Sequence, residues 1–372
     1  MRLYNSISII VAIGLMAILV SFSPSSSEEV AGNQICIDEN IQNTLDTLLV
    51  ERMAELNVPA AWGAVMEVSS GNLVAVSSWG NNQGTVSKIE NNLFLDLRDP
   101  GSIFQTVSYA ALLETGSINP ESIVDTGSTE EHPSTFNYHG KRMADDYPVG
   151  IVTAKEAIVQ GSTIAIVKLV SNAFEENPQV FMEAIAKLGW DETPLMIYEG
   201  DTLRTPHVRK YKDNIWSRLT LGQISYGYEM RTTPMHSLLF FNSIANDGVR
   251  PGVGRVCSEQ TAKMVRSALE GVVDHGTACT KWSDSGDIIR EGAKSRKVTI
   301  AGKTGRAQIF ANGTYYGNGN YATFVGFFPA EQPKYSCLVT LKAVRGGNFE
   351  RPDGGSLAGP VVRDLAEALL CK

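Results

Sequence analysis

The spacing of apolar residues changes from helical to alternating within the first part of the chain. Over residues 37–57, apolar side chains recur at helical spacing, which predicts an amphipathic helix that ends before Pro59. Residues 60–79 alternate between apolar and polar positions and are rich in valine, with the turn sequence Ser69-Ser70-Gly71-Asn72 at their centre. We therefore predict a helix followed by a β-hairpin.

The pattern changes again in the middle of the chain and returns to strands near its end. About residues 102–290 form an inserted region that is predicted to be largely helical, interrupted by loops with glycine and proline. Strand patterns follow at residues 298–310, 322–328 and 336–344, and a last amphipathic helix covers residues 359–370. These elements predict an α+β fold, in which both ends of the chain build one antiparallel sheet flanked by the terminal helices.

The first residues have the pattern of an export signal. Arg2 precedes an apolar run over residues 7–22, and a serine-rich spacer without a clean small-residue cleavage site follows. The run is shorter than the roughly 20 residues of a typical membrane-spanning helix. We favour an uncleaved anchor in the inner membrane, residues 1–27, and keep a cleaved signal as the alternative. Both place residues 28–372, as one domain, outside the cytoplasmic membrane or in the periplasm.

Composition and charge exclude several classes of protein. The chain of 372 residues is 43% hydrophobic and 19% charged, which is typical of a globular protein and not of a disordered one. Its formal net charge of -8 and the lack of a basic stripe argue against a nucleic-acid partner. Its five histidines show no paired, metal-ligating spacing, so we expect neither a metal nor a cofactor.

The chain has five cysteines, an odd number, so at least one is free or pairs between chains. Outside the cytoplasm, cysteines can form disulfides. Cys36 and Cys371 lie near the two ends of the exported portion. If the terminal helices pack side by side, these two residues could pair, which we state as a hypothesis.

Candidate chemistry begins at Ser102. The sequence Pro100-Gly101-Ser102 precedes an apolar helix, so the hydroxyl lies near the positive end of the helix dipole. In a serine acyl-transfer site of the S-x-x-K type, a lysine one turn later takes the serine proton. This chain has Gln105 at that position, and an amide cannot accept the proton at any useful pH. A serine that only caps a helix is the alternative interpretation of Ser102.

Two further segments complete the candidate site. Gly161, Ser162 and Thr163 stand where an S-x-N motif is expected, so Thr163 offers a hydroxyl in place of an amide and Gly161 offers no side chain. Lys303-Thr304-Gly305 lies on a predicted strand, where an exposed lysine and hydroxyl suit a substrate carboxylate and an extended peptide. Arg306 adds a second cation for anion binding.

These motifs, in this order, resemble the transpeptidase domain of penicillin-binding proteins, in particular the monofunctional class B type. The resemblance covers about residues 62–370. It implies the fold shared with serine β-lactamases, the ancestral nucleophile position at Ser102, and an exported, inner-membrane-anchored location. The large N-terminal pedestal domain usual in class B is expected to be absent, because little more than residues 28–59 precedes the hairpin. Six longer stretches carry the resemblance: residues 98–102, 112–116, 224–229, 233–248, 276–278 and 354–360.

The resemblance leaves two functions open. It implies binding of peptidoglycan stem peptides that end in D-Ala-D-Ala, or of β-lactams, and contacts with other proteins of cell-wall synthesis. Because proton transfer is what the changes at Gln105 and residues 161–163 affect, we favour a pseudoenzyme with impaired or lost catalysis. The alternative is an active serine D,D-transpeptidase or carboxypeptidase acylated on Ser102. We find no candidate for the deacylating base that a β-lactamase needs.

Overall fold

The computed structural model describes residues 34–127, 135–311, 313–344 and 346–371, without the side chains of residues 311 and 316–318. The N-terminal anchor predicted from the sequence lies outside these residues. Within the described ranges, no helix combines the length and the apolar character needed to cross a membrane.

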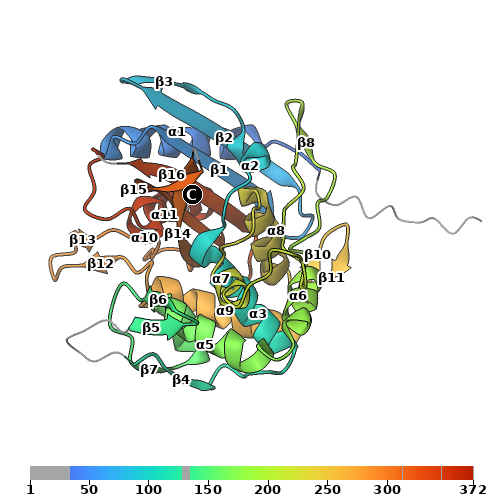
Figure 1. Cartoon of the computed structure of the whole chain (residues 1–372). Coiled ribbons are helices and arrows are strands. Elements are labelled where there is room, and N and C mark those ends of the chain that lie inside the picture. Colours follow the sequence, from blue (N-terminus) through green and yellow to red (C-terminus); the bar gives the residue numbers. More distant parts are fainter. Residues whose placement is uncertain (1–33, 128–134, 312, 345, 372) are drawn as a thin grey trace, which may run out of the picture. The chain divides into compact units, whose positions relative to one another are not determined.

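A six-stranded antiparallel sheet forms the centre of the fold (Figure 1). Its spatial order, β14-β15-β16-β1-β2-β3, joins strands from both ends of the chain, as predicted. Strand β15 begins earlier than predicted, and β3 was not predicted. The strands are β1 (Ala60–Glu67), β2 (Leu73–Asn82), β3 (Thr85–Lys88), β14 (Ala301–Ala311), β15 (Thr314–Phe328) and β16 (Tyr335–Val344).

The two terminal helices, α1 (Glu39–Leu56) and α11 (Gly359–Leu370), pack against each other and against the sheet. A Cβ atom added at Gly63 of β1 would lie 3.0 Å from a methyl carbon of Leu45 and 3.1 Å from one of Leu49. Glycine at this position therefore lets α1 approach the sheet closely. The helix and hairpin predicted from the sequence are confirmed, as is the last helix.

The inserted region packs its helices against the sheet and against one another. Helix α8 contacts β15 and β16, α9 contacts β14, and α3 contacts α5, α6 and α9. Helix α3 is buried along most of its length and forms the centre of this region. The helices are α2 (Asn92–Leu95), α3 (Phe104–Glu114), α4 (Ala154–Val159), α5 (Thr163–Phe174), α6 (Pro178–Lys187), α7 (Thr220–Ser225), α8 (Pro234–Ala245) and α9 (Glu259–Asp274), and a short α10 (Gly354–Leu357) precedes α11.

The middle of the chain contains more β-structure than predicted. Several two-stranded sheets lie between its helices. The pairs are β4 (Ile123–Asp125) with β7 (Ile151–Thr153), β5 (Thr135–Tyr138) with β6 (Lys141–Ala144), β8 (Ile197–Tyr198) with β9 (Asp201–Thr202), β10 (Val249–Arg250) with β11 (Gly254–Arg255), and β12 (Lys281–Trp282) with β13 (Ile288–Arg290).

Two of these pairs are tight hairpins that the sequence pattern does not predict. The turns consist of His139-Gly140, with φ of 47° and 95°, and Glu199-Gly200, with φ of 51° and 92°. Two successive positive φ angles are typical of the type I′ turn, whose usual sequence is Asn-Gly or Asp-Gly. The β2–β3 turn, Gln83-Gly84, has the same signature, with φ of 52° and 92°. Because none of the three has Asn or Asp before the glycine, the usual signal was missing.

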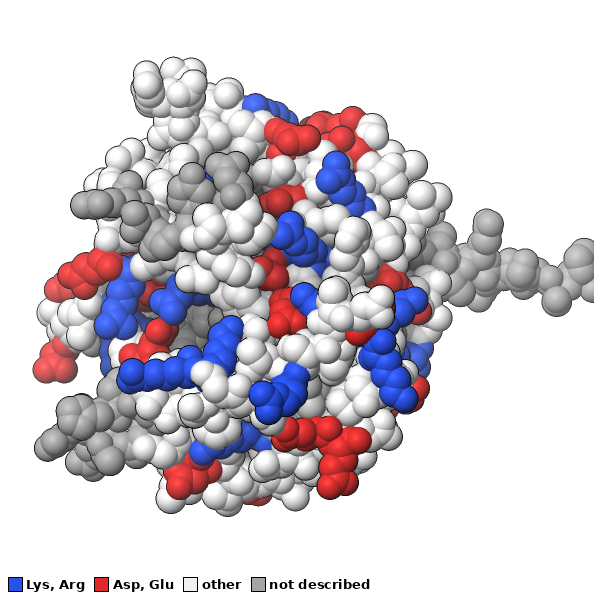
Figure 2. Space-filling model, in the orientation of Figure 1, with Lys and Arg blue, Asp and Glu red and all other residues white. Residues whose placement is uncertain are grey.

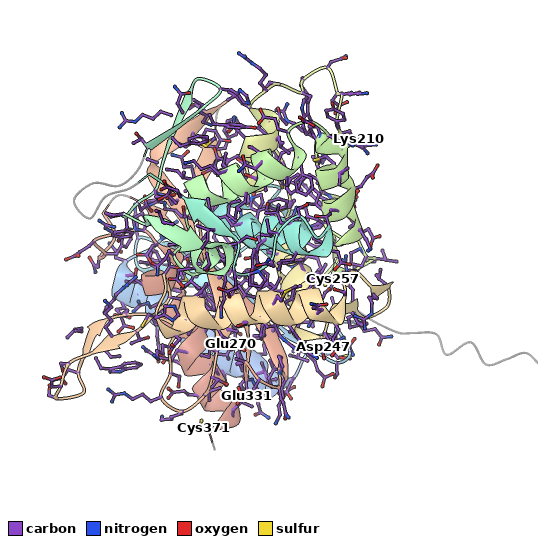
Figure 3. The ribbon with its side chains drawn as sticks, turned by 90° about the horizontal axis from the view of Figure 1, so that it is seen from below. Lys210, Asp247, Cys257, Glu270, Glu331 and Cys371 are labelled. Carbon is purple, nitrogen blue, oxygen red and sulfur yellow. The ribbon has the colours of Figure 1, made fainter. Side chains whose placement is uncertain are left out.

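All five cysteines lie within the described residues, and all five are free thiols. The bridge between Cys36 and Cys371 is therefore not formed, although the terminal helices do pack side by side. The backbone N–H of Cys36 donates a hydrogen bond to the carbonyl of Leu73 at the start of β2. Cys371 instead follows the last turn of α11. Figure 3 shows Cys371 well apart from Cys257 in the view from below.

A short 3₁₀ turn (Gly101–Ile103) leads into α3 and lies against β14. Gly101 has a φ of +62°, and an added Cβ would lie 2.5 Å from the carbonyl oxygen of Arg306. A Cβ added at Gly227 would lie 2.1 Å from the carbonyl oxygen of Gly101. The backbone at Gly101 is thus in close contact with β14 and with the chain at Gly227.

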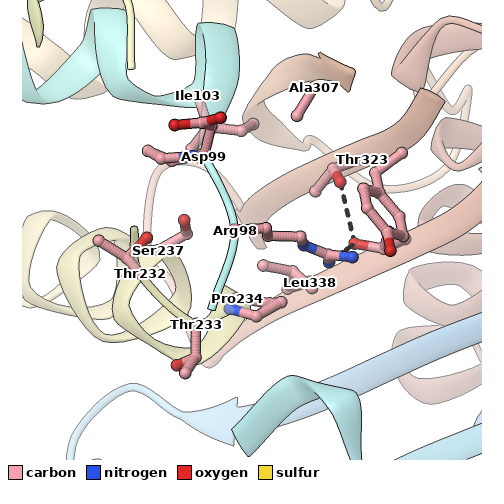
Figure 4. Close-up of a pocket in the computed structure, with 13 residues that line it drawn as sticks. Arg98, Asp99, Ile103, Thr232, Thr233, Pro234, Ser237, Ala307, Thr323 and Leu338 are labelled. Atoms are coloured by element: carbon pink, nitrogen blue, oxygen red, sulfur yellow. Dashed lines mark hydrogen bonds between the residues drawn. The ribbon is translucent and has the colours of Figure 1, made fainter. Parts of the chain in front are cut away.

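A small cavity of about 20 Å³ lies behind this turn (Figure 4). Pro100 and Ile103 line it from the turn, Ser237 lines it from α8, and Thr323 lines it from β15. The volume suits a single water molecule.

We expect the substitution Gly101→Ala to lower the free energy of unfolding by about 3 kcal/mol or more, because it adds a backbone clash to the strain of a positive φ. Gly116 is the matched control, because its φ is +68° and an added Cβ would meet nothing within 4 Å. Gly116→Ala should cost only about 1–2 kcal/mol. Denaturant unfolding measures both, and equal losses would contradict the role given to the contact with Arg306.

Candidate active site

A cleft of about 1180 Å³ runs between β14 and the inserted region. It brings together Ser102, Gly161, Thr163 and the segment 303–306, which come from three distant parts of the sequence. Gln105 and Ser162 are fully buried and do not line it. Figure 2 shows a hollow on this face of the molecule with Lys and Arg side chains around it.

Ser102 lies in the middle of the 3₁₀ turn, and its half-buried side chain faces the cleft. Neither the turn nor α3 has a side-chain capping bond, so the interpretation of Ser102 as a mere helix cap is wrong. Its Oγ instead accepts a hydrogen bond from the backbone N–H of Arg306, at 3.4 Å. Among the hydrogen bonds of the described residues, Ser102 Oγ has no other partner.

Gln105 lies one turn further along, as predicted, and its side chain is completely buried. Its amide Nε2 donates to the carbonyl oxygen of Gly161 at 3.4 Å and to Thr163 Oγ1 at 3.3 Å. Its Oε1 is buried and receives no hydrogen bond from any described residue. Gln105 therefore ties α3 to the start of α5 and makes no hydrogen bond to Ser102.

The side chains of segment 161–163 lie in different environments. Thr163 faces the cleft, whereas the Ser162 hydroxyl caps α5 by accepting from the N–H of Ala165 and donates to Asp145 Oδ2 at 2.6 Å. Burial raises the pKa of Asp145 against the opposing effect of these bonds. Ser162, a candidate catalytic residue because of its place in this segment, has its hydroxyl in the capping network and does not line the cleft. No motif or spacing in the sequence pointed to Asp145.

Lys303 departs from the expectation of an exposed strand edge, because its side chain is only 1% exposed. Its Nζ donates to the carbonyl of Thr304 at 3.1 Å. A Cβ added at Gly161 would lie 3.5 Å from this Nζ and 4.0 Å from Gln105 Oε1, so Gly161 lies near both side chains and contributes no hydroxyl of its own. Burial without an acidic partner lowers the pKa of Lys303 to about 7.

The hydroxyl of Thr304 is paired with that of Thr277, at 2.8 Å. Thr277 lines the cleft and was not assigned a role from the sequence, although it lies in one of the stretches that carry the resemblance. The two hydroxyls stand beside Lys303 and form a polar end of the cleft that suits an anionic group.

A second acidic side chain, that of Asp99, also lines the cleft. Asp99 precedes Ser102 in the sequence. Burial raises its pKa, and Tyr315 donates to its Oδ2 at 2.8 Å. The ring of Tyr315 packs edge-on against Phe310 and Tyr228, with ring centres 5.0 and 6.0 Å apart. This wall combines apolar surface with one carboxyl group.

Among the described residues, no group of three or more His, Cys, Asp or Glu side chains is arranged to hold a metal ion. The cleft is lined by hydroxyls, amides, carboxylates, the buried Lys303 and several arginines.

Comparison with known proteins yields a family match over most of the chain. The family model "Penicillin binding protein transpeptidase domain" matches residues 62–367. Penicillin-binding protein PbpB of Mycolicibacterium smegmatis is 25% identical over 361 residues, which cover 91% of this chain and 53% of PbpB. The probable peptidoglycan D,D-transpeptidase PenA of Neisseria flavescens is 23% identical over 353 residues, 90% of this chain and 81% of PenA. The chain thus spans about half the length of PbpB and most of PenA.

Solved structures share the fold. The transpeptidase domain of penicillin-binding protein 3 from Burkholderia pseudomallei has a TM-score of 0.75 and 24% identity, and the match covers 91% of this chain and 96% of that domain. Penicillin-binding protein 3 of Mycobacterium tuberculosis, in a complex with aztreonam, has a TM-score of 0.73 and 21% identity, with coverage of 90% and 78%.

We expect the stability of the wild type to rise with pH above 7 through Lys303. An unfolded lysine has a pKa of about 10.4, so between pH 7 and 10 the unfolded chain binds more protons, and the free energy of unfolding increases by about 1 kcal/mol per pH unit. Lys303→Met should remove this contribution and stabilise the protein at pH 7. Lys281→Met, at an exposed lysine, should keep the wild-type pH dependence. Urea unfolding at pH 7 and 8.5 measures the difference, and parallel pH profiles of wild type and Lys303→Met would contradict it.

Proposed function

Because this chain belongs to the penicillin-binding-protein transpeptidase-domain family, we propose that it binds D-alanyl stem peptides of peptidoglycan, and β-lactams, with slow or absent acyl transfer at Ser102. The observation that carries the proposal is the position of Gln105. Its amide is bonded to Gly161 and Thr163, and it occupies the place of the base without being able to act as one.

The consequence for Ser102 follows from its single hydrogen bond. The Arg306 N–H is a donor, so it cannot take the proton that Ser102 must lose to attack a carbonyl carbon. Losing a general base costs about 10²–10⁴-fold in rate. The same N–H supports a different task, because a backbone donor aimed at Ser102 would stabilise an oxyanion formed there.

The residues that would bind a peptide match the motifs of the family better than the residues that would transfer the proton. Strand β14 is the edge of the sheet that faces the cleft, so an extended peptide can add to it through backbone hydrogen bonds. The hydroxyls of Thr277 and Thr304 lie beside Lys303 and suit the terminal carboxylate of such a peptide. The complexes of the mycobacterial relative with aztreonam and ampicillin support β-lactams as further ligands.

The location belongs to the proposal as well. We infer that residues 1–27 hold the domain at the inner membrane, outside the cytoplasm, where peptidoglycan and other proteins of cell-wall synthesis are present. The apolar run and the function of the family support this inference.

A fluorescent penicillin tests the proposal directly. We expect wild type to be labelled slowly or not at all, and Gln105→Lys to be labelled about 10²–10⁴-fold faster, because burial at this position lowers the pKa of the new lysine, which can then act as a base. Gln105→Met is the matched control, which removes the amide without adding a base and should gain nothing. Label must disappear when Ser102→Ala is combined with Gln105→Lys. Prompt labelling of wild type that Ser102→Ala abolishes would overturn the proposal.

One observation favours the alternative, an active D,D-transpeptidase or carboxypeptidase. Lys303 lines the same cleft with a pKa of about 7, so at neutral pH about half of the molecules carry a neutral amine that could replace the missing base.

On this alternative, the rate of penicillin labelling rises with pH through about 7, because deprotonation of Lys303 creates the base. Lys303→Met should abolish both the rise and the labelling, while Lys281→Met should leave them unchanged. Labelling of wild type that does not change between pH 6 and 8.5 excludes Lys303 as the base.

A further inference from the structure

We propose that Arg306, with Arg290 and Arg351 lining the same cleft, forms a second carboxylate-binding subsite, so that the D-alanyl peptide accepted by this cleft carries an acidic side chain. This inference rests on the proposed function and specifies its substrate class.

The position of Arg306 follows from the alternation of side chains along β14. Lys303 and Ala307 are buried, whereas the Arg306 side chain is 44% exposed and lines the cleft. Thr304 and Arg306 are two residues apart and share one face of the strand, so their Cα atoms are about 7 Å apart. A peptide that binds along β14 with its terminal carboxylate at Thr304 therefore places a neighbouring side chain within reach of Arg306.

Arg290 and Arg351 extend the positive charge at this end of the cleft. Arg290 Nη2 donates to the carbonyl of Thr277 at 3.2 Å, next to the Thr277–Thr304 hydroxyl pair. Arg351 donates to the Tyr147 hydroxyl, and its guanidinium lies 4.8 Å from the centre of that ring. Among the ion pairs of the described residues, neither arginine has a carboxylate partner, so both keep an unneutralised charge.

Asp146 shows what chemistry Arg306 accepts. Its Oδ1 lies 3.0 Å from Arg306 Nη2, and both side chains are well exposed. Asp146 comes from the opposite side of the cleft, in the segment between β6 and β7, and is followed by Tyr147, the partner of Arg351. Since an exposed ion pair changes an equilibrium by only about two- to fivefold, a ligand carboxylate can replace Asp146 at little cost.

The other acidic residues of the cleft are bound to partners other than Arg290, Arg306 and Arg351. Glu229 pairs with Arg209, and the remaining acids are bound as caps or by hydroxyls: Asp145 to Ser162, Asp353 to Ser356 and Asp99 to Tyr315. The chain as a whole is acidic, with a net charge of -8, and yet this end of the cleft gathers arginines. The local charge suits a ligand with more than one carboxylate.

Two fluorescein-labelled peptides test the subsite by fluorescence polarisation: Glu-D-Ala-D-Ala and Gln-D-Ala-D-Ala, which differ only in a carboxylate against a carboxamide. We expect wild type to prefer the acidic peptide by about two- to tenfold. Arg306→Gln, which keeps the backbone N–H at Ser102, should reduce the preference to about one. Asp146→Asn should raise the affinity for the acidic peptide by about two- to fivefold and leave the other unchanged. Arg218→Gln, at an exposed arginine outside the cleft, is the control and should behave as wild type.

Each outcome of the binding experiment supports or contradicts the subsite. Equal affinities of wild type for the two peptides, or a preference that persists in Arg306→Gln, overturns the subsite while the proposed function stands. If wild type binds neither peptide, the proposed function fails and the subsite fails with it. Unfolding midpoints of the variants within the range of the Arg218→Gln control establish that a lost preference does not come from misfolding.

Discussion

The close backbone contact between Gly101 and β14 is the constraint on which the site depends. A turn without a side chain at this point lets the start of α3 lie against the carbonyl of Arg306, and the next residue, Ser102, then meets the Arg306 N–H. The inserted region and the sheet are far apart in sequence here, and this contact fixes their register. Any side chain at position 101 would separate Ser102 from strand β14.

Behind this contact, the site is organised around a single buried lysine. Gln105 removes a cation from the base position and joins α3 to α5 through neutral hydrogen bonds. Gly161 removes the side chain that would stand between Lys303 and this glutamine. Lys303 itself donates to the backbone carbonyl of Thr304, and burial disfavours its charged form. Under the proposed function, the changes in the two motifs are consistent with each other, because both would affect proton transfer and both leave the Lys303-Thr304-Gly305 segment of β14 unchanged.

The sequence sufficed for the sheet, the terminal helices and the gathering of the three motifs, because each rests on periodicity or on an ordered set of short signals. It failed where the outcome depends on tertiary contacts. Ser162 lies in the segment that matches S-x-N, but its hydroxyl caps α5 and is bound to Asp145, which lies 17 residues earlier in the sequence. Lys303 has the residue type of an exposed cation, but the alternation of β14 turns it inward. The Gln83-Gly84 turn and its relatives lack Asn or Asp, so only the backbone angles identify them.

The two edges of the central sheet differ in a way that bears on solubility. Strand β3 has four residues and ends at Lys88, which makes it a poor template for another chain. Strand β14 has eleven residues and would be a hazard for edge-to-edge aggregation if it were freely accessible. The turn at Gly101 packs on it, and the remaining part lies within the cleft, where a single extended peptide fits more readily than the edge of a second folded domain. The geometry that admits a ligand thereby also protects the protein from self-association through its longest open strand.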